Sequence, residues 1–410
     1  MTTPHEPHLR RAVGPVLLTL YGIGVTIGAG IYVLIGEVAG VAGMAAPVAF
    51  MLAGILAGLS ALSYAELATQ YPKAGGEATY VNVAFARPRL TTVTGLLVAF
   101  SGITSSAAVL LGFVGYLNEL VTVPARIALL GIIGVRAVVT FWGESQSMII
   151  VAISTLIEIG GLLLVIGAGL PVLQDFPQAL PAMWPGLDGM VWLLVLSSSV
   201  LAFFAFIGFE DIVNMAEEVK TPGRTLPVAI IVTLIVSTLL YVLLTTISVL
   251  AVDPSELGAS DAPLAEVFGA SGGNPAILSS IAILAVVNGA LIQIIMVSRL
   301  LYGMARLGRL PNVLAHVHPI TRTPDVSIIG VALIVLAFAL TLPIAELASY
   351  ASLAVLGVFS LVNAALLVLR RSKDYGVPVS QVPLFVPVLG CAASLALLAF
   401  GIAQRLGLLL

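Results

Sequence analysis

The stretch GIGVTIGAGIYVLIG, residues 22–36, places Gly28 and Gly30 in the middle of an apolar run. Glycine in a helix interior costs about 1 kcal/mol relative to alanine. Lipid offers no hydrogen-bond partner, so a membrane helix can be interrupted only where protein or a cavity surrounds the freed backbone groups. Interrupted helices of this kind carry the binding sites of many secondary transporters. The alternative is close helix packing through small residues, and the stretch alone does not decide between the two.

Composition indicates a membrane protein with little mass outside the bilayer. The chain has 410 residues, of which 60% are hydrophobic and 9% are charged, whereas soluble domains carry about 25% charged residues. A single cysteine, Cys391, excludes an intramolecular disulfide and a cysteine metal cluster. We expect no cofactor, no metal and no catalytic residue, and the net charge of −3 gives no indication of nucleic-acid binding. No separate cleavable signal peptide is apparent, so the first apolar segment is expected to direct insertion.

Eleven segments are long and apolar enough to be candidate membrane spans, since a span needs about 20 apolar residues. Their predicted ranges are 13–35, 46–69, 92–117, 124–141, 147–173, 190–214, 226–251, 275–305, 326–343, 346–369 and 384–404.

The placement of basic residues predicts the orientation, because loops on the cytoplasmic side carry an excess of Lys and Arg. With a cytoplasmic N-terminus, 14 of the 17 Lys and Arg fall on the inner side. The two long outer loops, 174–189 and 252–274, contain acids but no Lys or Arg. An odd number of spans then puts the C-terminus outside.

A second interruption is predicted in the sixth span and its exit, SSSVLAFFAFIGFEDIVNMAEEVKTPGRTLP, residues 197–227. Gly208 precedes two adjacent acids, Glu210 and Asp211. The first and sixth spans are five apart, so they cross the membrane in opposite directions. An inverted five-plus-five repeat produces this arrangement, with an interrupted helix opening each half. The predicted parts are a cytoplasmic N-terminus (1–12), two repeats (13–173 and 190–371) and an additional transmembrane helix (384–410).

Four stretches together resemble the amino acid–polyamine–organocation superfamily, in particular bacterial permeases similar to cationic amino acid transporters. They are residues 22–36, ALSYAELATQYPKAGGEATY (61–80), the sixth span with its exit, and SRLLYGMARLGRLPNVLAHVHP (298–319). The resemblance implies an all-α polytopic membrane protein of the leucine-transporter type, with discontinuous helices 1 and 6. Members typically have twelve or more spans, and this chain has eleven candidates.

A free amino acid is a zwitterion, so its site must offer donors to a carboxylate and acceptors to an ammonium. Helix interruptions supply both without a charged side chain. We expect the backbone of Ile27 to Gly30 to contact the carboxylate, and carbonyls near Thr26 and Phe204 to Ile207 to contact the ammonium. The resemblance implies that Phe204 covers the substrate. The full predicted set is Thr26, Ile27, Gly28, Ala29, Gly30, Ser105, Phe204, Ala205, Phe206, Ile207, Gly208, Asn288 and Ser352.

Two acids are candidates for ion coupling or gating. Glu158 lies about eleven residues into the fifth span, ~16 Å deep at 1.5 Å per residue. An intramembrane acid is costly unless it is paired or protonated, and it commonly marks a functional site. In some related transporters a lysine at this position takes the place of a sodium ion. Glu158 carries the opposite charge, which leaves binding of a proton or of a cation open. The alternative is a protonated structural acid. Glu210 is expected to begin the inner half of the sixth helix, where a carboxylate gains from the helix N-terminus.

The leading hypothesis is a secondary active amino acid transporter of the cell membrane, which couples uptake of small or apolar neutral amino acids to a proton rather than to sodium. Its partners would be the substrate, the ion and the lipid bilayer, and its oligomeric state is open. A cationic amino acid, polyamine or organic amine permease or exchanger is the alternative within transport. A channel and a membrane enzyme are the other classes weighed. No Walker motif is present, so ATP does not drive transport directly.

Overall fold

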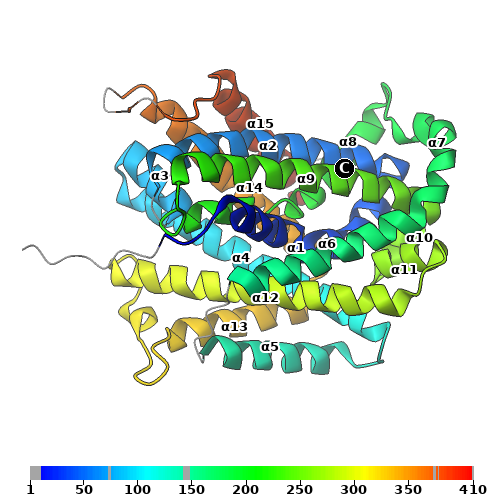
Figure 1. Ribbon diagram of the computed structural model, residues 1–410, viewed down its shortest axis with the longest axis horizontal. Helices are drawn as coiled ribbons and strands as arrows, with labels where there is room; N and C mark the ends of the chain where they lie inside the picture. Colours follow the sequence, from blue (N-terminus) through cyan, green and yellow to red (C-terminus); the bar gives the residue numbers. More distant parts are fainter. Residues whose placement is uncertain (1–10, 73–74, 142–147, 373–374, 377, 409–410) are drawn as a thin grey trace, which may run out of the picture.

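The computed structural model describes residues 11–72, 75–141, 148–372, 375, 376 and 378–408. Its long helices lie side by side along the longest axis of the molecule (Figure 1). The helices are α1 (Pro15–Ala42), α2 (Ala46–Gln70), α3 (Gly76–Phe85), α4 (Pro88–Asn118), α5 (Ala125–Phe141), α6 (Met148–Gly169), α7 (Phe176–Met183), α8 (Gly189–Phe204), α9 (Pro222–Ala251), α10 (Pro254–Ala259), α11 (Pro263–Ala270), α12 (Pro275–Arg306), α13 (Asp325–Thr341), α14 (Ile344–Leu369) and α15 (Phe385–Arg405).

The chain is an all-helical, multi-pass membrane protein. Within the described ranges, eight helical stretches are long and apolar enough to cross a membrane. The first of them, Pro15–Gln70, contains both α1 and α2, while α13 and the described part of α5 are shorter apolar helices. Ten of the eleven predicted spans each overlap one α-helix, whereas the span predicted at 190–214 covers α8, a turn and most of a 3₁₀ helix, Phe209–Met215. The short helices α3, α7, α10 and α11 form in segments that the sequence analysis treated as loops.

Both predicted interruptions are confirmed. In α1, Gly28 has non-helical dihedrals (φ 7°, ψ −139°) between two helical segments. Helix α8 ends at Phe204, a turn follows, and Gly208 adopts φ 126°, a left-handed conformation that favours glycine. The chain then continues as a 3₁₀ helix, Phe209–Met215. These two interruptions, at 26–30 of α1 and 204–208 after α8, are called the α1 break and the α8 break below.

The prediction that Glu210 begins a second α-helix is wrong in one respect, because residues 209–215 form a 3₁₀ helix. The Glu210 carboxylate accepts a hydrogen bond from the backbone N–H of Gly208 at 2.8 Å. A short side chain-to-backbone bond of this kind offers the backbone an alternative to regular helix bonding. Glu210 therefore stabilises the turn itself.

The two broken helices run in opposite directions. Just before α1, the N–H of Val13 donates to the carbonyl of Glu218 at 3.0 Å, and the N–H of Lys220 donates to the carbonyl of Val13 at 3.1 Å. The beginning of α1 thus lies beside the end of the segment that follows the α8 break. At the breaks, Gly208 lies against Val25 and Ala205 lies against Gly30. Later residues of α1 thus meet earlier residues of the other segment, so the two segments run antiparallel, as the predicted inverted repeat requires.

The two breaks are in direct contact, which explains why Gly30 and Gly208 cannot carry side chains. A Cβ added at Gly30 would lie 2.9 Å from Cα of Ala205, and one added at Gly208 would lie 2.8 Å from the carbonyl oxygen of Val25. Real Cβ atoms do not approach backbone this closely. Close packing and helix interruption were alternative interpretations of the glycine-rich stretch, and both hold in the structure.

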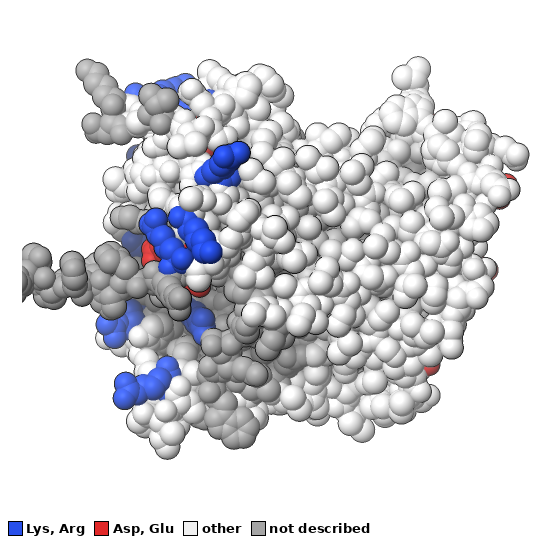
Figure 2. Space-filling model, in the orientation of Figure 1, with Lys and Arg blue, Asp and Glu red and all other residues white. Residues whose placement is uncertain are grey.

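Charged residues gather at one end of the molecule. In Figure 2 the visible Lys and Arg side chains lie at the left end, and the other end shows only a few acids. Helix α3 lies at the basic end, whereas α7, α10 and α11 lie at the opposite end (Figure 1). Arg10, Lys73 and Lys373 of the predicted inner group, and residues 1–10 of the predicted cytoplasmic segment, lie outside the described residues.

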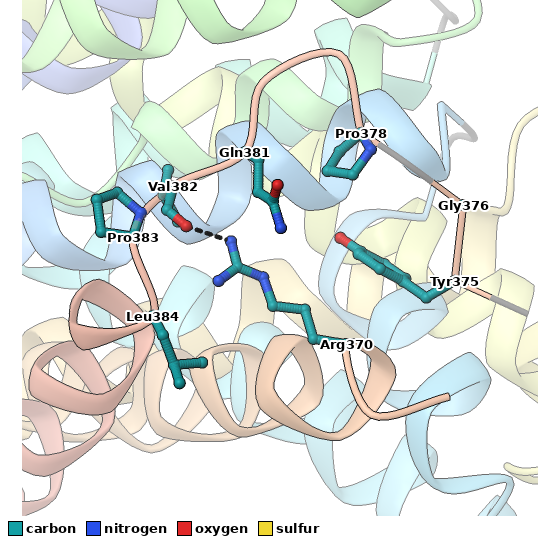
Figure 3. A pocket seen from close by; sticks show the side chains of 8 residues that line it. All are labelled: Arg370, Tyr375, Gly376, Pro378, Gln381, Val382, Pro383 and Leu384. Atoms are coloured by element: carbon teal, nitrogen blue, oxygen red, sulfur yellow. Dashed lines mark hydrogen bonds between the residues drawn. The ribbon is translucent and has the colours of Figure 1, made fainter. Parts of the chain in front are cut away.

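An ion pair fastens the loop between α14 and α15 to α2. Glu66 is fully buried, and its carboxylate accepts bonds from the Arg370 guanidinium, the Tyr375 hydroxyl (3.0 Å) and the backbone N–H of Val382 (2.8 Å). Figure 3 shows Arg370 pointing toward the Val382 carbonyl, which it also contacts at 2.6 Å. Residues of this loop line an open cavity of about 670 Å³. The bonds of one buried carboxylate, that of Glu66, thus hold this loop against the C-terminal end of α2.

Removal of either charge should destabilise the protein, because the other charge would remain buried without a partner. We expect Glu66→Ala or Arg370→Ala to lower the free energy of unfolding by about 3–5 kcal/mol. The measurement is denaturant unfolding of purified protein in detergent. The matched control is the double variant Glu66→Met with Arg370→Met, which removes both charges and should cost less than either single change. A double variant less stable than both singles would contradict this account.

Candidate functional site

A small cavity lies between the two breaks. Its volume is about 30 Å³. Its walls come from α1, α4, α12 and the α8 break, which are far apart in the sequence. The lining residues are Val25, Thr26, Gly30, Ser105, Val109, Phe204, Ile207, Gly289, Ile292 and Gln293.

Five of the predicted substrate residues line this cavity: Thr26, Gly30, Ser105, Phe204 and Ile207. They come from three separate segments that the sequence analysis singled out independently. A volume of 30 Å³ is roughly the share of one water molecule in the liquid. An amino acid is several times larger, so its binding requires the walls to move apart.

The other predicted residues are not among those that line this cavity. Gly28 forms the α1 break, and Ile27 is buried beside it. Gly208 is the left-handed residue of the α8 break. Ser352 on α14 is fully buried, and its hydroxyl has no hydrogen-bond partner within the described part of the chain. The side chain of Ala29 lies outside the described part of the structure.

Tyr241 on α9 is a residue that the sequence analysis missed. Its buried hydroxyl lies 2.9 Å from the backbone carbonyl of Thr26 in the α1 break and 2.9 Å from that of Ala205 in the α8 break. The ring of Phe206 packs edge-on against the Tyr241 ring with centroids 5.1 Å apart. Phe206 and Ala205 therefore face α9. No local sequence signal identifies Tyr241, which reads as one aromatic residue in an apolar span.

Glu158 occupies a separate cavity of about 220 Å³ between α6 and α12. The residue is 1% exposed, and neither carboxyl oxygen has a hydrogen-bond partner of regular geometry among the described residues. Asn288 of α12 lines the same cavity and interacts with the carboxyl group. The structure thus places Asn288 with Glu158. The polar side chain that α12 gives to the cavity between the breaks is Gln293, five residues further along.

Three acids gather in a second small cavity beside the breaks. Glu77, Glu210 and Asp211 line a cavity of about 20 Å³ that shares Ile207 and Gln293 with the cavity between the breaks. Burial, and then the charge of Asp211, raise the pKa of Glu77 on α3 from its usual value to about 7. The hydroxyl of Tyr64 donates to the Glu77 carboxylate at 3.3 Å.

A metal centre finds no support in the described ranges, which hold no group of three or more His, Cys, Asp or Glu residues that could bind a metal ion.

Comparisons with known proteins identify the family. The family model for amino acid permeases matches residues 14–405. The chain is 33% identical to the vacuolar cationic amino acid transporter 4 of Arabidopsis thaliana, over 92% of this chain and 66% of that protein. It is 30% identical to the branched-chain amino acid permease BcaP of Bacillus subtilis, over 90% and 83% of the two chains. It is 29% identical to the methylthioribose transporter of Bacillus subtilis, over 93% and 85%.

The chain spans about two thirds of the length of the Arabidopsis transporter and most of the length of the bacterial ones. Its family consists of transporters and not of enzymes. The resemblance drawn from the four sequence stretches is confirmed. The chain belongs to the amino acid permease family within the amino acid–polyamine–organocation superfamily.

Proposed function

We propose that this protein is a secondary active transporter of amino acids that works by alternating access around the cavity between the breaks. The observation that carries the proposal is the direct contact of two interrupted, antiparallel helices at a cavity lined by residues from both. Irregular backbone at membrane depth is tolerated where it lines a cavity, and sites of this type bind substrates of secondary transporters. Family membership supports the same conclusion.

The fold proposed for this activity is an inverted repeat of five plus five helices. Its halves are residues 13–173 and 190–371, opened by α1 and α8, and α15 lies outside the repeat. The opposite course of α1 and the segment that contains the α8 break supports it, because Val13 lies beside Glu218 whereas Gly30 lies beside Ala205. The basic end of the molecule is cytoplasmic, as the distribution of Lys and Arg predicts, and the membrane is the cell membrane, in keeping with the bacterial relatives.

Recognition of the amino acid rests on backbone groups. The half of α1 that follows Gly28 begins a new helical segment, whose first N–H groups lack intrahelical partners and favour a carboxylate. The carbonyls of the α1 and α8 breaks accept from the ammonium. Phe204 and Ile207 cover the substrate side chain, with Ser105 and Gln293 as the polar contacts from α4 and α12.

The lining favours small or apolar neutral amino acids, because the side chains that face the cavity are Val25, Val109, Phe204, Ile207 and Ile292 beside few polar groups. A buried Lys or Arg head group without a counter-charge is costly. Cationic amino acids are the second candidate, since the cavity that holds Glu77, Glu210 and Asp211 adjoins the first one through Ile207 and Gln293. The name of the Arabidopsis relative points in that direction, and that of the Bacillus permease points to neutral substrates.

Proton coupling is assigned to Glu158 in this proposal. Its carboxyl group is buried, without a regular hydrogen-bond partner in the described part of the chain, and beside a cavity large enough for several water molecules. Such an acid binds or releases a proton as its surroundings open and close. Among the described residues, no basic side chain lines its cavity.

Binding should require both the α-carboxylate and the α-amine. In a thermal-shift screen of the purified protein against the twenty amino acids, a ligand present at 100 times its Kd should stabilise the folded state by about 2.7 kcal/mol. The decarboxylated and N-acetylated analogues of the best ligand should give no shift and should not compete with it. A simple amine that competes as well as its parent amino acid would show that the α1 break does not bind a carboxylate.

Competitive uptake separates the two substrate classes. Proteoliposomes take up labelled alanine or leucine in the presence of unlabelled alanine, leucine, arginine or lysine. We expect the neutral amino acids to compete at least about tenfold better, because burial of an unpaired cationic head group costs more than about 1.4 kcal/mol. If arginine or lysine outcompetes both neutral amino acids, the substrate is cationic and its head group binds in the adjoining acidic cavity.

A further inference from the structure

The Tyr241 hydroxyl connects the two breaks to each other. It lies 2.9 Å from the carbonyl oxygens of Thr26 and Ala205, which belong to different halves of the chain. Each carbonyl sits where a helix is interrupted and where the regular ladder of backbone bonds stops. A buried carbonyl without a partner is costly, so a donor at this place stabilises both interruptions together.

The Tyr241 ring is fixed in place by its neighbours. It is fully buried in the middle of α9, a continuous helix of 30 residues. Phe206 packs edge-on against it with centroids 5.1 Å apart, and Phe50 of α2 does so at 5.9 Å. A ring held by packing on two sides gives its hydroxyl a defined position. Tyr241 thus brings α1, α2, α8 and α9 to one point.

One hydroxyl cannot satisfy both carbonyls fully. A phenol donates a single proton, whereas each carbonyl oxygen has two lone pairs. The two carbonyls therefore share one donor and keep capacity to accept from a second donor with several N–H groups. An α-ammonium group is such a donor, with three N–H bonds in a compact cation. The two carbonyls that share this one donor belong to the segments that the proposed function assigns to the substrate ammonium.

We propose that Tyr241 is a positioning residue for the amino acid: its hydroxyl holds the α1 break and the α8 break at a fixed separation, so that the two segments bind one substrate as a single surface. This inference rests on the proposed function. Tyr241 does not line the cavity between the breaks, and it acts through the backbone of Thr26 and Ala205.

The test compares two buried tyrosines. Tyr241→Phe removes the bridging hydroxyl. The matched control is Tyr116→Phe, since Tyr116 on α4 is equally buried and its hydroxyl donates to the Tyr32 carbonyl of α1 at 2.6 Å, beyond the break. The probe is whichever of alanine, leucine and arginine stabilises the unmodified protein most, and the readouts are its Kd and the thermal midpoint of the ligand-free protein.

We expect both variants to lower the thermal midpoint to a similar extent, because each loses a buried hydroxyl-to-carbonyl bond. Only Tyr241→Phe should weaken binding, by about tenfold or more, with the change in Kd for Tyr116→Phe within about threefold. Equal losses of affinity in the two variants, or an unchanged Kd for Tyr241→Phe, would overturn the inference. An unmodified protein that none of the three amino acids stabilises would instead count against the proposed function.

A rescue variant separates positioning from packing. Replacement of Tyr241 by 4-aminophenylalanine keeps the ring and supplies two N–H donors, one for each carbonyl. We expect this variant to bind the probe within about threefold of the unmodified protein. It also carries the test if Tyr241→Phe fails to fold, because a folded amino variant that binds about tenfold more weakly would contradict a role through the two carbonyls.

Discussion

Glu158→Gln should abolish uphill accumulation of amino acid in proteoliposomes under an imposed proton gradient. Glutamine has nearly the shape of the neutral acid but cannot release a proton, so the variant remains in the protonated-like state throughout the cycle. Net transport then follows the substrate gradient alone, and the internal concentration should not rise above the external one. Counterflow exchange needs no net ion movement and should survive. The measurement is the accumulation ratio of the labelled amino acid with and without the gradient.

The structure explains why binding should survive this change. Glu158 lies in its own cavity between α6 and α12, apart from the cavity between the breaks. A link between them exists in α1, because the Tyr32 hydroxyl donates to the backbone carbonyl of Glu158 at 2.7 Å, four residues after the break at Gly28. On α12, Asn288 faces the Glu158 cavity while the next residue, Gly289, lines the cavity between the breaks. The Glu158 cavity is therefore connected to the proposed site through α1 and α12 without sharing a lining residue with it.

Glu210→Gln is the matched control for the glutamate experiment. Glu210 is also buried, but its carboxylate already accepts a bond from the N–H of Gly208. We expect this variant to retain at least part of the gradient-driven accumulation. Full accumulation by Glu158→Gln would refute proton coupling at Glu158 and assign it to Glu210 or to sodium. A Glu158→Gln protein that does not fold would support a purely structural role for the acid.

Local sequence predicted the features of this fold that depend on residue type over short distances. The eleven apolar segments each overlap an α-helix, and the helix interruptions occur at Gly28 and Gly208, where glycine stands in an otherwise apolar run. Glu158 is the eleventh residue of α6, as its place in the predicted span required. Hydropathy and glycine placement carry this information directly.

Features that depend on contacts between distant segments were not predictable from one sequence. The Arg370–Glu66 pair joins residues 304 positions apart, and the Tyr241 bridge spans 215 and 36 positions. On α12, Asn288 and Gln293 are both polar, but they are five residues apart and so point to different sides of the helix. The sequence does not say which side faces the breaks, and Asn288 was chosen where the structure places Gln293.

Gly28→Leu should abolish amino acid binding and leave the protein folded. A Cβ added at Gly28 meets no atom within 4 Å, so the new side chain enters open space at the α1 break instead of a packed interface. That space is where the substrate carboxylate would reach the backbone of the following half-helix. A leucine side chain and a substrate carboxylate cannot occupy this space together. We therefore expect the Kd to rise by more than about 100-fold, which corresponds to a loss of more than about 2.7 kcal/mol of binding free energy.

Gly30→Leu is a less specific test of the same site. A Cβ added at Gly30 would lie 2.9 Å from Cα of Ala205, so that variant also disturbs the packing of the two breaks and should lower the thermal midpoint. The matched control for Gly28→Leu is Gly58→Leu on α2, where an added Cβ likewise meets nothing within 4 Å and the break is not involved. Both variants should remain folded, and only Gly28→Leu should lose the ligand-induced shift. A Kd of Gly28→Leu within about threefold of that of the unmodified protein would show that the substrate carboxylate does not bind at the α1 break, because a leucine side chain there covers the backbone N–H groups.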